Sequence, residues 1–213
     1  MSYHPSANRA TFDRYLTEGE EKQLFRYMKK QAGPLARRDR AWMLLLRVTG
    51  IRVGTLAQLT LGEARDALAT ERLHLRDEIS KGGRGYSLRL FGAGLDALRE
   101  LIAARRAMGM PMIEDDALVV SQRGTPLAVR SYQARMQMWV NEAGLRIKAS
   151  PHWWRHTLGK RAIAEAQSRG AADPLAHAQV VLGPARRQTT EIYTLPDRAD
   201  IEYTLRGAQP RGL

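Results

Sequence analysis

Apolar residues along most of this chain recur at the three- and four-residue spacing of amphipathic helices, and one stretch departs from that pattern. Between Leu73 and Leu90 apolar and polar residues alternate, as in a β-strand, on both sides of a glycine-rich turn at 80–85. This pattern predicts a β-hairpin inserted among helices. A third short strand is expected at 118–121, so the predicted fold is mainly α with a small antiparallel three-stranded sheet.

The remaining periodicity predicts helices, and local signals mark several of their ends. Thr17 and Glu20 have the spacing of a capping box, which opens a helix, and Gly33-Pro34 closes it. The expected helices cover residues 17–30, 37–49, 53–61, 95–102, 129–143, 152–168, 174–182, 189–194 and 197–207. Residues 1–15 show little pattern and are expected to form a flexible arm, which leaves 16–213 as one domain.

The charge of the chain indicates a class of partner. Its 34 Lys and Arg residues outnumber its 22 Asp and Glu residues, so the formal net charge is +12. A basic domain attracts polyanions, and nucleic acid is the partner that this balance favours. A ribosome-associated or merely soluble basic protein is the plain alternative at this point, and a membrane-surface protein is a weaker one.

Several classes of protein are excluded by composition and by the apolar runs. The absence of Cys excludes disulfides and Cys-ligated zinc. The longest unbroken apolar run, 41–46, is too short to cross a bilayer, and the first ten residues lack the apolar segment of a signal peptide. We therefore expect a cytoplasmic, nucleoid-associated protein with no membrane partner.

Four short motifs carry side chains suited to phosphate chemistry. Arg52 emerges at a helix break, and Lys81 lies in the glycine-rich turn of the hairpin. His152 and Arg155 are three residues apart, so one helix face presents both an imidazole for proton transfer and a guanidinium for a phosphate. Tyr193 follows in the segment 188–194. Taken singly, each has an ordinary structural explanation: an arginine on carbonyls, a solvated lysine or a packed tyrosine.

A metal site is not expected. His152 and His156 are four residues apart, a spacing that suits a metal, but no carboxylate or Cys lies nearby in sequence to complete a site. We expect no cofactor, and we expect Trp153, Trp154 and His156 to be buried in the core.

Taken in order along the chain, these motifs resemble the catalytic domain of the tyrosine recombinases, or phage-type integrases. The resemblance includes 49–52, the Lys81 turn, His152-x-x-Arg155, and Leu182-Gly183 followed by 189–194. It extends to the openings at 16–18 and 38–41 and to the Ser-x-Arg-Gly-x-Pro-Leu segment at 121–127. Each motif alone is weak, whereas the ordered set is specific to the family.

The resemblance implies a DNA strand transferase that joins the 3′ phosphate of a cut strand to a tyrosine. It implies that Arg52 and Arg155 clamp the scissile phosphate. It implies further that Tyr193 is the nucleophile, that Lys81 protonates the leaving 5′ oxygen, and that His152 assists proton transfer or binds the phosphate. Since two arginines supply the positive charge, no metal is implied.

Two positions depart from the pattern of the family. After Leu182-Gly183 the family usually has His, sometimes Trp, but this chain has Pro184, which offers neither a side-chain donor nor a backbone N–H. Three residues after the first arginine the usual Glu or Asp is replaced by Thr55, which carries no charge. Arg186 or Arg187 is expected to replace the missing donor in part. These departures predict a slow or tightly conditional enzyme.

The resemblance also implies partners. It implies double-stranded DNA and a tetramer on two duplexes, linked by exchange of a terminal segment, for which 197–207 is the candidate; free of DNA, we expect a monomer. The amino-terminal DNA-gripping domain of most members is expected to be absent, so DNA binding is expected to be weak at moderate salt unless oligomers or accessory DNA-bending or targeting proteins help. Candidate DNA contacts lie at the hairpin tip, on the 129–143 helix and after Gly183: Arg84, Arg130, Gln133, Arg135, Arg186 and Arg187. An ordinary polar face is an equal alternative for that helix.

Two other functions stay open beside a site-specific recombinase. A type IB topoisomerase shares the Arg, Lys, Arg, His and Tyr set and only relaxes supercoils. A catalytically weakened DNA-binding regulator or accessory factor of the same fold would account for Pro184 and Thr55.

Overall fold

The computed structural model of the protein describes residues 14–80 and 83–183. Its elements, in chain order, are α1 (Glu18–Lys29), α2 (Pro34–Thr49), α3 (Val53–Leu56), α4 (Leu61–Thr70), β1 (Arg72–Leu75), the 3₁₀ turn η2 (Asp77–Ile79), β2 (Tyr86–Arg89), α5 (Gly92–Ala107), α6 (Val129–Glu142), α7 (His152–Ser168) and α8 (Pro174–Leu182). No helix among these combines the length and the apolar character that a membrane span needs. The helices predicted at 189–194 and 197–207, and most of the predicted arm, fall outside the described residues.

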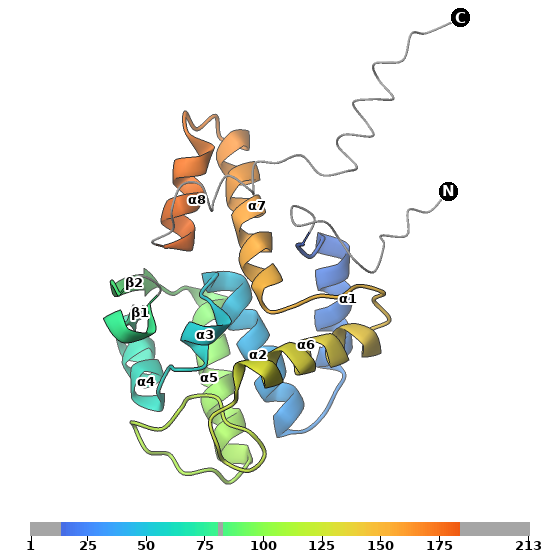
Figure 1. Cartoon of the computed structure of the whole chain (residues 1–213), viewed down its shortest axis with the longest axis vertical. Helices are drawn as coiled ribbons and strands as arrows, with labels where there is room; N and C mark the ends of the chain where they lie inside the picture. Colours follow the sequence, from blue (N-terminus) through green and yellow to red (C-terminus); the bar gives the residue numbers. More distant parts are fainter. Residues whose placement is uncertain (1–13, 81–82, 184–213) are drawn as a thin grey trace, which may run out of the picture.

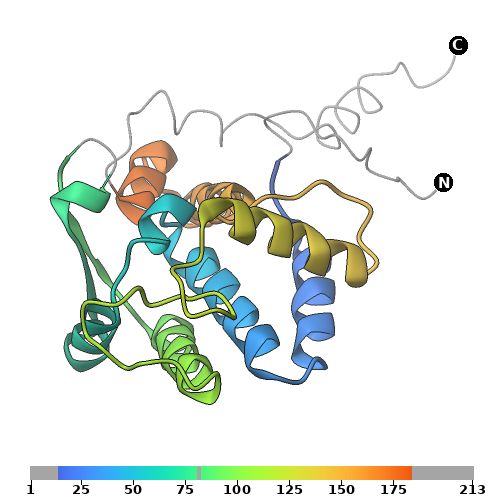
Figure 2. The same cartoon turned by 60° about the horizontal axis from the view of Figure 1, so that its bottom comes forward.

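Helix α2 lies in the middle of the molecule, with α5 on one side and α1 on the other (Figures 1 and 2). Its sequence explains this position, because Trp42, Met43, Leu45 and Leu46 are all fully buried and cover more than one face of the helix. Helix α7 packs against α2 as well, and α8 packs against α7. The α2 helix is therefore the support on which the remaining helices are placed.

The predicted hairpin is confirmed, whereas the prediction of three strands is wrong for the described part of the chain. Strands β1 and β2 pair antiparallel, with Leu73 opposite Leu88. The segment 118–121 makes one isolated bridge, Val120 with Pro126, and the residue before it, Ala117, makes another with Thr60. It folds back on itself, since Ser121 N donates to Thr125 O at 2.7 Å and Leu127 N to Val119 O at 3.0 Å. Its other backbone groups bind outside the hairpin, with Leu118 N donating to Leu59 O at 2.7 Å and Val120 O accepting from Arg38, and they do not extend the sheet.

The predicted helix at 53–61 ends early in the structure, and a helix that was not predicted follows it. Helix α3 ends at Leu56, and α4 begins after Thr60, whose hydroxyl accepts from Glu63 N at 3.2 Å while Glu63 accepts from Thr60 N at 2.8 Å. This reciprocal capping box is a start signal visible in the sequence. Helix α2 also begins earlier than predicted, at Pro34, a residue well suited to a first turn because its missing N–H needs no partner there.

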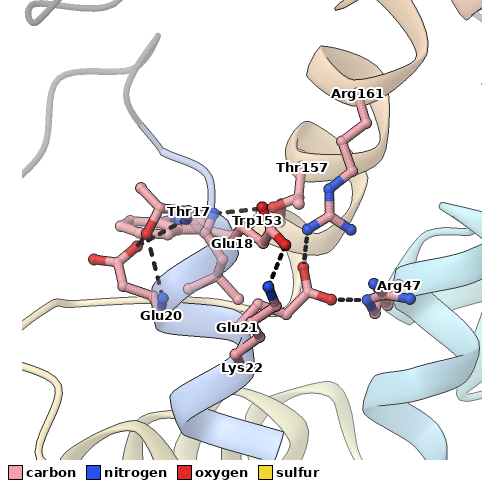
Figure 3. A network of polar contacts seen from close by, with 10 residues as sticks. Thr17, Glu18, Glu20, Glu21, Lys22, Arg47, Trp153, Thr157 and Arg161 are labelled. Carbon is pink, nitrogen blue, oxygen red and sulfur yellow. Dashed lines mark hydrogen bonds and ion pairs between the residues drawn. The ribbon is translucent and has the colours of Figure 1, made fainter. Parts of the chain in front are cut away.

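Helix α1 fixes the position of α7 through a polar network (Figure 3). Glu21 is 4% exposed and forms ion pairs with Arg47 of α2 and Arg161 of α7. Nearby, Leu16 N donates to Thr157 Oγ1 at 2.9 Å. Because a buried carboxylate is stable only when it is paired, this network holds α1, α2 and α7 in one arrangement. Helix α7 is the element that carries His152 and Arg155.

Candidate active site

Arg155 lies at the centre of the candidate site and is 3% exposed. Its Nη1 donates to Gly50 O at 2.7 Å and to Leu182 O at 2.9 Å. These carbonyls lie at the carboxyl ends of α2 and α8, where helices leave acceptors without partners inside the helix. A single guanidinium on α7 therefore holds the carboxyl ends of α2 and α8.

The turn at Gly50 brings Arg52 to the same place. Gly50 has φ 63°, a left-handed conformation that glycine adopts without strain, and a Cβ there would lie 2.8 Å from Leu158 Cδ2. Two residues later Arg52 is the N-cap of α3, and its side chain is half-buried. Arg155 thus binds the carbonyl two residues before Arg52, and the charges of both arginines act on Tyr86, so the two predicted arginines lie near one corner of the fold.

His152 is the first residue of α7 and is exposed. Its ring meets the ring of His156 edge-on, with centroids 4.7 Å apart. His156 is buried, as predicted, and the pKa of its imidazole falls to about 4, first because of burial and then because of the nearby positive charges of His152, Arg155, Arg14 and Lys160. His156 is therefore neutral at pH 7, and the exposed His152 is the imidazole that a substrate can reach.

Thr55, which stands in place of the family's acidic residue, has a structural partner. Its hydroxyl donates to Ile79 O at 3.0 Å, and both Thr55 and Ile79 are buried. This bond ties α3 to η2, immediately before the hairpin turn that contains Lys81. A neutral donor thus serves the main-chain acceptor that faces it, which a carboxylate is unable to do.

The other predicted catalytic residues are not described by the structure. Lys81 lies in the gap between Ser80 and Gly83, and Pro184, Arg186, Arg187 and Tyr193 follow the last described residue, Gly183. Their predicted roles stay predictions. Of the five predicted catalytic residues, the structure describes three, and it brings Arg52 and Arg155 together with His152 one helical turn away.

The predicted DNA-binding residues fall into two groups. Arg84 at the hairpin tip is exposed, as are Arg130 and Gln133 on α6. Arg135 differs, because its guanidinium forms an ion pair with the fully buried carboxylate of Asp39. The structure thus gives Arg135 a partner inside the protein, and its predicted contact with DNA remains untested.

An open groove of about 660 Å³ follows the exposed side of α6 and the segment after it. It is lined by Gln133, Gln137, Asn141, Arg146, Ile147, Lys148, Ala149 and Ser150. Arg146 and Lys148 were not among the DNA-binding residues predicted from the sequence. The sequence does contain a signal for them, because apolar residues and cations alternate along 145–149, and the apolar ones are buried while the cations are exposed.

Comparison with known proteins gives a consistent result. The model of the family described as "Phage integrase family" matches residues 14–199. The tyrosine recombinase XerC of Shewanella amazonensis is 35% identical over 177 residues, which are 83% of this chain and 55% of that protein. The chain thus spans little more than half the length of this curated relative.

Solved structures share the fold. The crystal structure of XerA recombinase has a TM-score of 0.70 at 24% identity, covering 98% of this chain and 68% of that one. A XerH site-specific recombinase bound to its difH substrate, in a pre-cleavage complex, has a TM-score of 0.65 at 21% identity, covering 96% of this chain and 57% of that one. The resemblance drawn from the ordered motifs is confirmed, and the chain belongs to the phage integrase family.

Proposed function

We propose that this chain carries the catalytic activity of a site-specific DNA recombinase. The observation that supports this most is that Arg155 donates to Gly50 O, two residues before Arg52, and that both charges act on Tyr86, so two permanent cations from distant parts of the chain lie near one corner of the fold. A guanidinium is planar and holds its charge at every physiological pH, so a pair of them suits a phosphodiester whose charge grows in the transition state.

The proposed reaction is a transesterification without loss of a phosphodiester bond. The phenol oxygen of Tyr193 attacks the scissile phosphorus, and the bond to the 5′ oxygen breaks as Lys81 gives that oxygen a proton. The phenol proton is lost with the help of His152, which lies exposed at the start of α7. The product is a 3′-phosphotyrosine, and attack by a 5′ hydroxyl of a partner strand reverses the step and rejoins the DNA.

The proposed partner is double-stranded DNA. The net charge of +12 supports it, and so does the groove beside α6, which presents the amide of Gln133 together with Arg146 and Lys148. Arg84, Arg130, Arg186 and Arg187 are proposed as further contacts. We also propose a tetramer on two duplexes, helped by accessory proteins, and a location in the cytoplasm on the nucleoid. No metal is part of this proposal.

The test is a nicked suicide substrate, which loses the attacking 5′ hydroxyl and traps the covalent adduct. The unaltered chain is expected to form a protein–DNA adduct that resists denaturation, and Tyr193→Phe is expected to form none. Mixing two marked duplexes separates the outcomes, because exchange requires both while relaxation by a topoisomerase requires one.

A DNA-binding regulator of the same fold is the second candidate, and Pro184 and Thr55 favour it. It predicts DNA binding with no adduct from the unaltered chain. An adduct that persists in Tyr193→Phe would contradict the proposed nucleophile.

A further inference from the structure

A second tyrosine, Tyr86, lies at the candidate active site. It is the first residue of β2, where it pairs with Leu75, and its ring packs on Gly183 at the end of α8. A Cβ at Gly183 would lie 2.5 Å from Tyr86 Cε2 and 2.9 Å from Cζ, the carbon that carries the hydroxyl. The ring edge that contains Cε2 and the hydroxyl-bearing Cζ therefore covers the side of Gly183 on which a side chain would lie.

Arg155 and Tyr86 contact two consecutive residues, Leu182 and Gly183. Arg155 Nη1 donates to Leu182 O at 2.9 Å, and the Tyr86 ring covers Gly183, the next residue. The same Nη1 donates to Gly50 O, two residues before Arg52. Three elements, β2, α7 and the start of α3, thus direct a phenol and two guanidinium groups to one place.

The state of the phenol suits hydrogen-bond donation. Burial raises the pKa of Tyr86 above its usual value, and the nearby charges of Arg155 and Arg52 lower it by less. The group is protonated at pH 7. Within residues 14–80 and 83–183 its hydroxyl makes no hydrogen bond, so its proton is available to a ligand.

We infer that the Tyr86 hydroxyl donates a hydrogen bond to a non-bridging oxygen of the phosphate clamped by Arg52 and Arg155, and so supplies the donor that Pro184 lacks. The inference rests on the proposed function. In the sequence, Pro184 directly follows the glycine on which the Tyr86 ring lies.

The substitution Tyr86→Phe tests this inference, because it removes the hydroxyl and keeps the ring on Gly183. We expect adduct formation on the nicked substrate to slow by about 10²-fold, as is typical for the loss of one preorganised donor, with DNA affinity unchanged. Tyr132→Phe is the matched control. Tyr132 is fully buried, its hydroxyl has no partner in the described residues, and its ring packs edge-on against Trp42. We expect this variant to cleave at the rate of the unaltered chain.

A neutral substrate distinguishes contact with the phosphate from a structural effect. Replacing one non-bridging oxygen by a methyl group gives two diastereomers, each lacking one acceptor. We expect the defect of Tyr86→Phe to vanish on one diastereomer and to persist on the other. An equal defect on both, or no defect on the ordinary phosphodiester, would overturn the inference.

The failure of the proposed function has a different signature. If Tyr86→Phe abolishes the adduct while Tyr193→Phe keeps it, Tyr86 is itself the nucleophile and both proposals are wrong. If the unaltered chain forms no adduct, both the proposed function and this inference are wrong. An adduct that depends on Tyr193 and is insensitive to Tyr86→Phe overturns only the inference.

Discussion

At the scale of single residues, the site depends on side chains whose charge state the fold controls. Arg155 keeps its charge although it is buried, because guanidinium deprotonates only at very high pH and two carbonyls accept from it. His156, beside it, loses its charge for the opposite reason: burial and neighbouring cations both disfavour the protonated imidazole. The corner thus holds fixed positive charge next to a neutral histidine.

His156 is expected to make the fold sensitive to acid. Its pKa is lowered from 6.5 to about 4 in the folded chain, so the unfolded chain binds the proton more tightly. The contribution of His156 to the free energy of unfolding is complete above pH 6.5 and is lost as the pH falls towards 4. At pH 4.5 the free energy of unfolding is lower by about 2–3 kcal/mol. Urea unfolding at pH 7 and pH 4.5 measures this loss.

The control for that experiment is His156→Gln, which does not titrate. Its free energy of unfolding should fall less between the two pH values than that of the unaltered chain. An identical pH dependence in both proteins would show that His156 is not responsible.

Residue-level reasoning from sequence reached some of this site and not the rest. Arg52, His152 and Arg155 were predicted from the ordered motifs that resemble the tyrosine recombinases, and helix geometry puts His152 and Arg155 on one face of α7. Tyr86 was not predicted at the site, and neither was the partner of Thr55, since Gly183 and the Ile79 carbonyl lie far along the chain from the residues that they contact. A contact between distant segments has no local periodicity to reveal it.

At the scale of elements, Asp39 fixes α6 against α2. Its Oδ1 accepts from Arg38 and Trp42, and its Oδ2 from Arg135 and Trp139, while the carboxylate is fully buried. Arg38 also donates to Val120 O at 2.8 Å, which brings the segment before α6 into the same network. One carboxylate on α2 thus positions the helix that borders the proposed DNA groove.

Asp39→Ala is expected to lower the free energy of unfolding by about 3–5 kcal/mol, because it leaves buried cations without their counter-charge. Denaturant unfolding followed by tryptophan fluorescence measures this directly, since Trp42 and Trp139 both donate to the lost group. Asp96→Ala is the control. Its carboxylate is 65% exposed and pairs with Arg99 on the same helix, so a change of less than about 1 kcal/mol is expected. Similar losses in the two variants would contradict the role given to Asp39.

Elements were predictable where their signals are local. The capping box of α1, the Pro174 start of α8 and the alternation of the hairpin all appear in the structure as predicted. The third strand was wrong because an apolar run at 118–121 reads like a strand, although only tertiary structure decides which backbone its groups meet. Helix α4 was not predicted, although Thr60 and Glu63 have the sequence spacing of its capping box.

At the scale of the whole molecule, the net charge of +12 supports the proposed binding of DNA. Each phosphate that a cation neutralises releases condensed counterions, so DNA affinity falls steeply as salt rises. The exposed cations of the groove, Arg146 and Lys148, are the described groups best placed to contribute.

The double variant Arg146→Gln with Lys148→Gln is expected to reduce the slope of log affinity against log salt by about 2. Fluorescence anisotropy on a labelled duplex at several salt concentrations measures the slope. The control removes the same charge elsewhere: Arg99→Gln with Arg169→Gln, two exposed arginines that pair with carboxylates on their own helices. If both double variants change the slope equally, the groove is not the DNA-binding face.

The two carbonyls held by Arg155 have a consequence for how this lineage can change. An arginine that braces three helices is retained by selection for folding alone, so a descendant that had stopped cutting DNA would still keep it. Under the proposed function, the loss of activity is better traced through exposed positions such as His152, whose substitution is not expected to destabilise the fold. The presence of the buried arginine therefore does not separate active relatives from relatives that have lost activity.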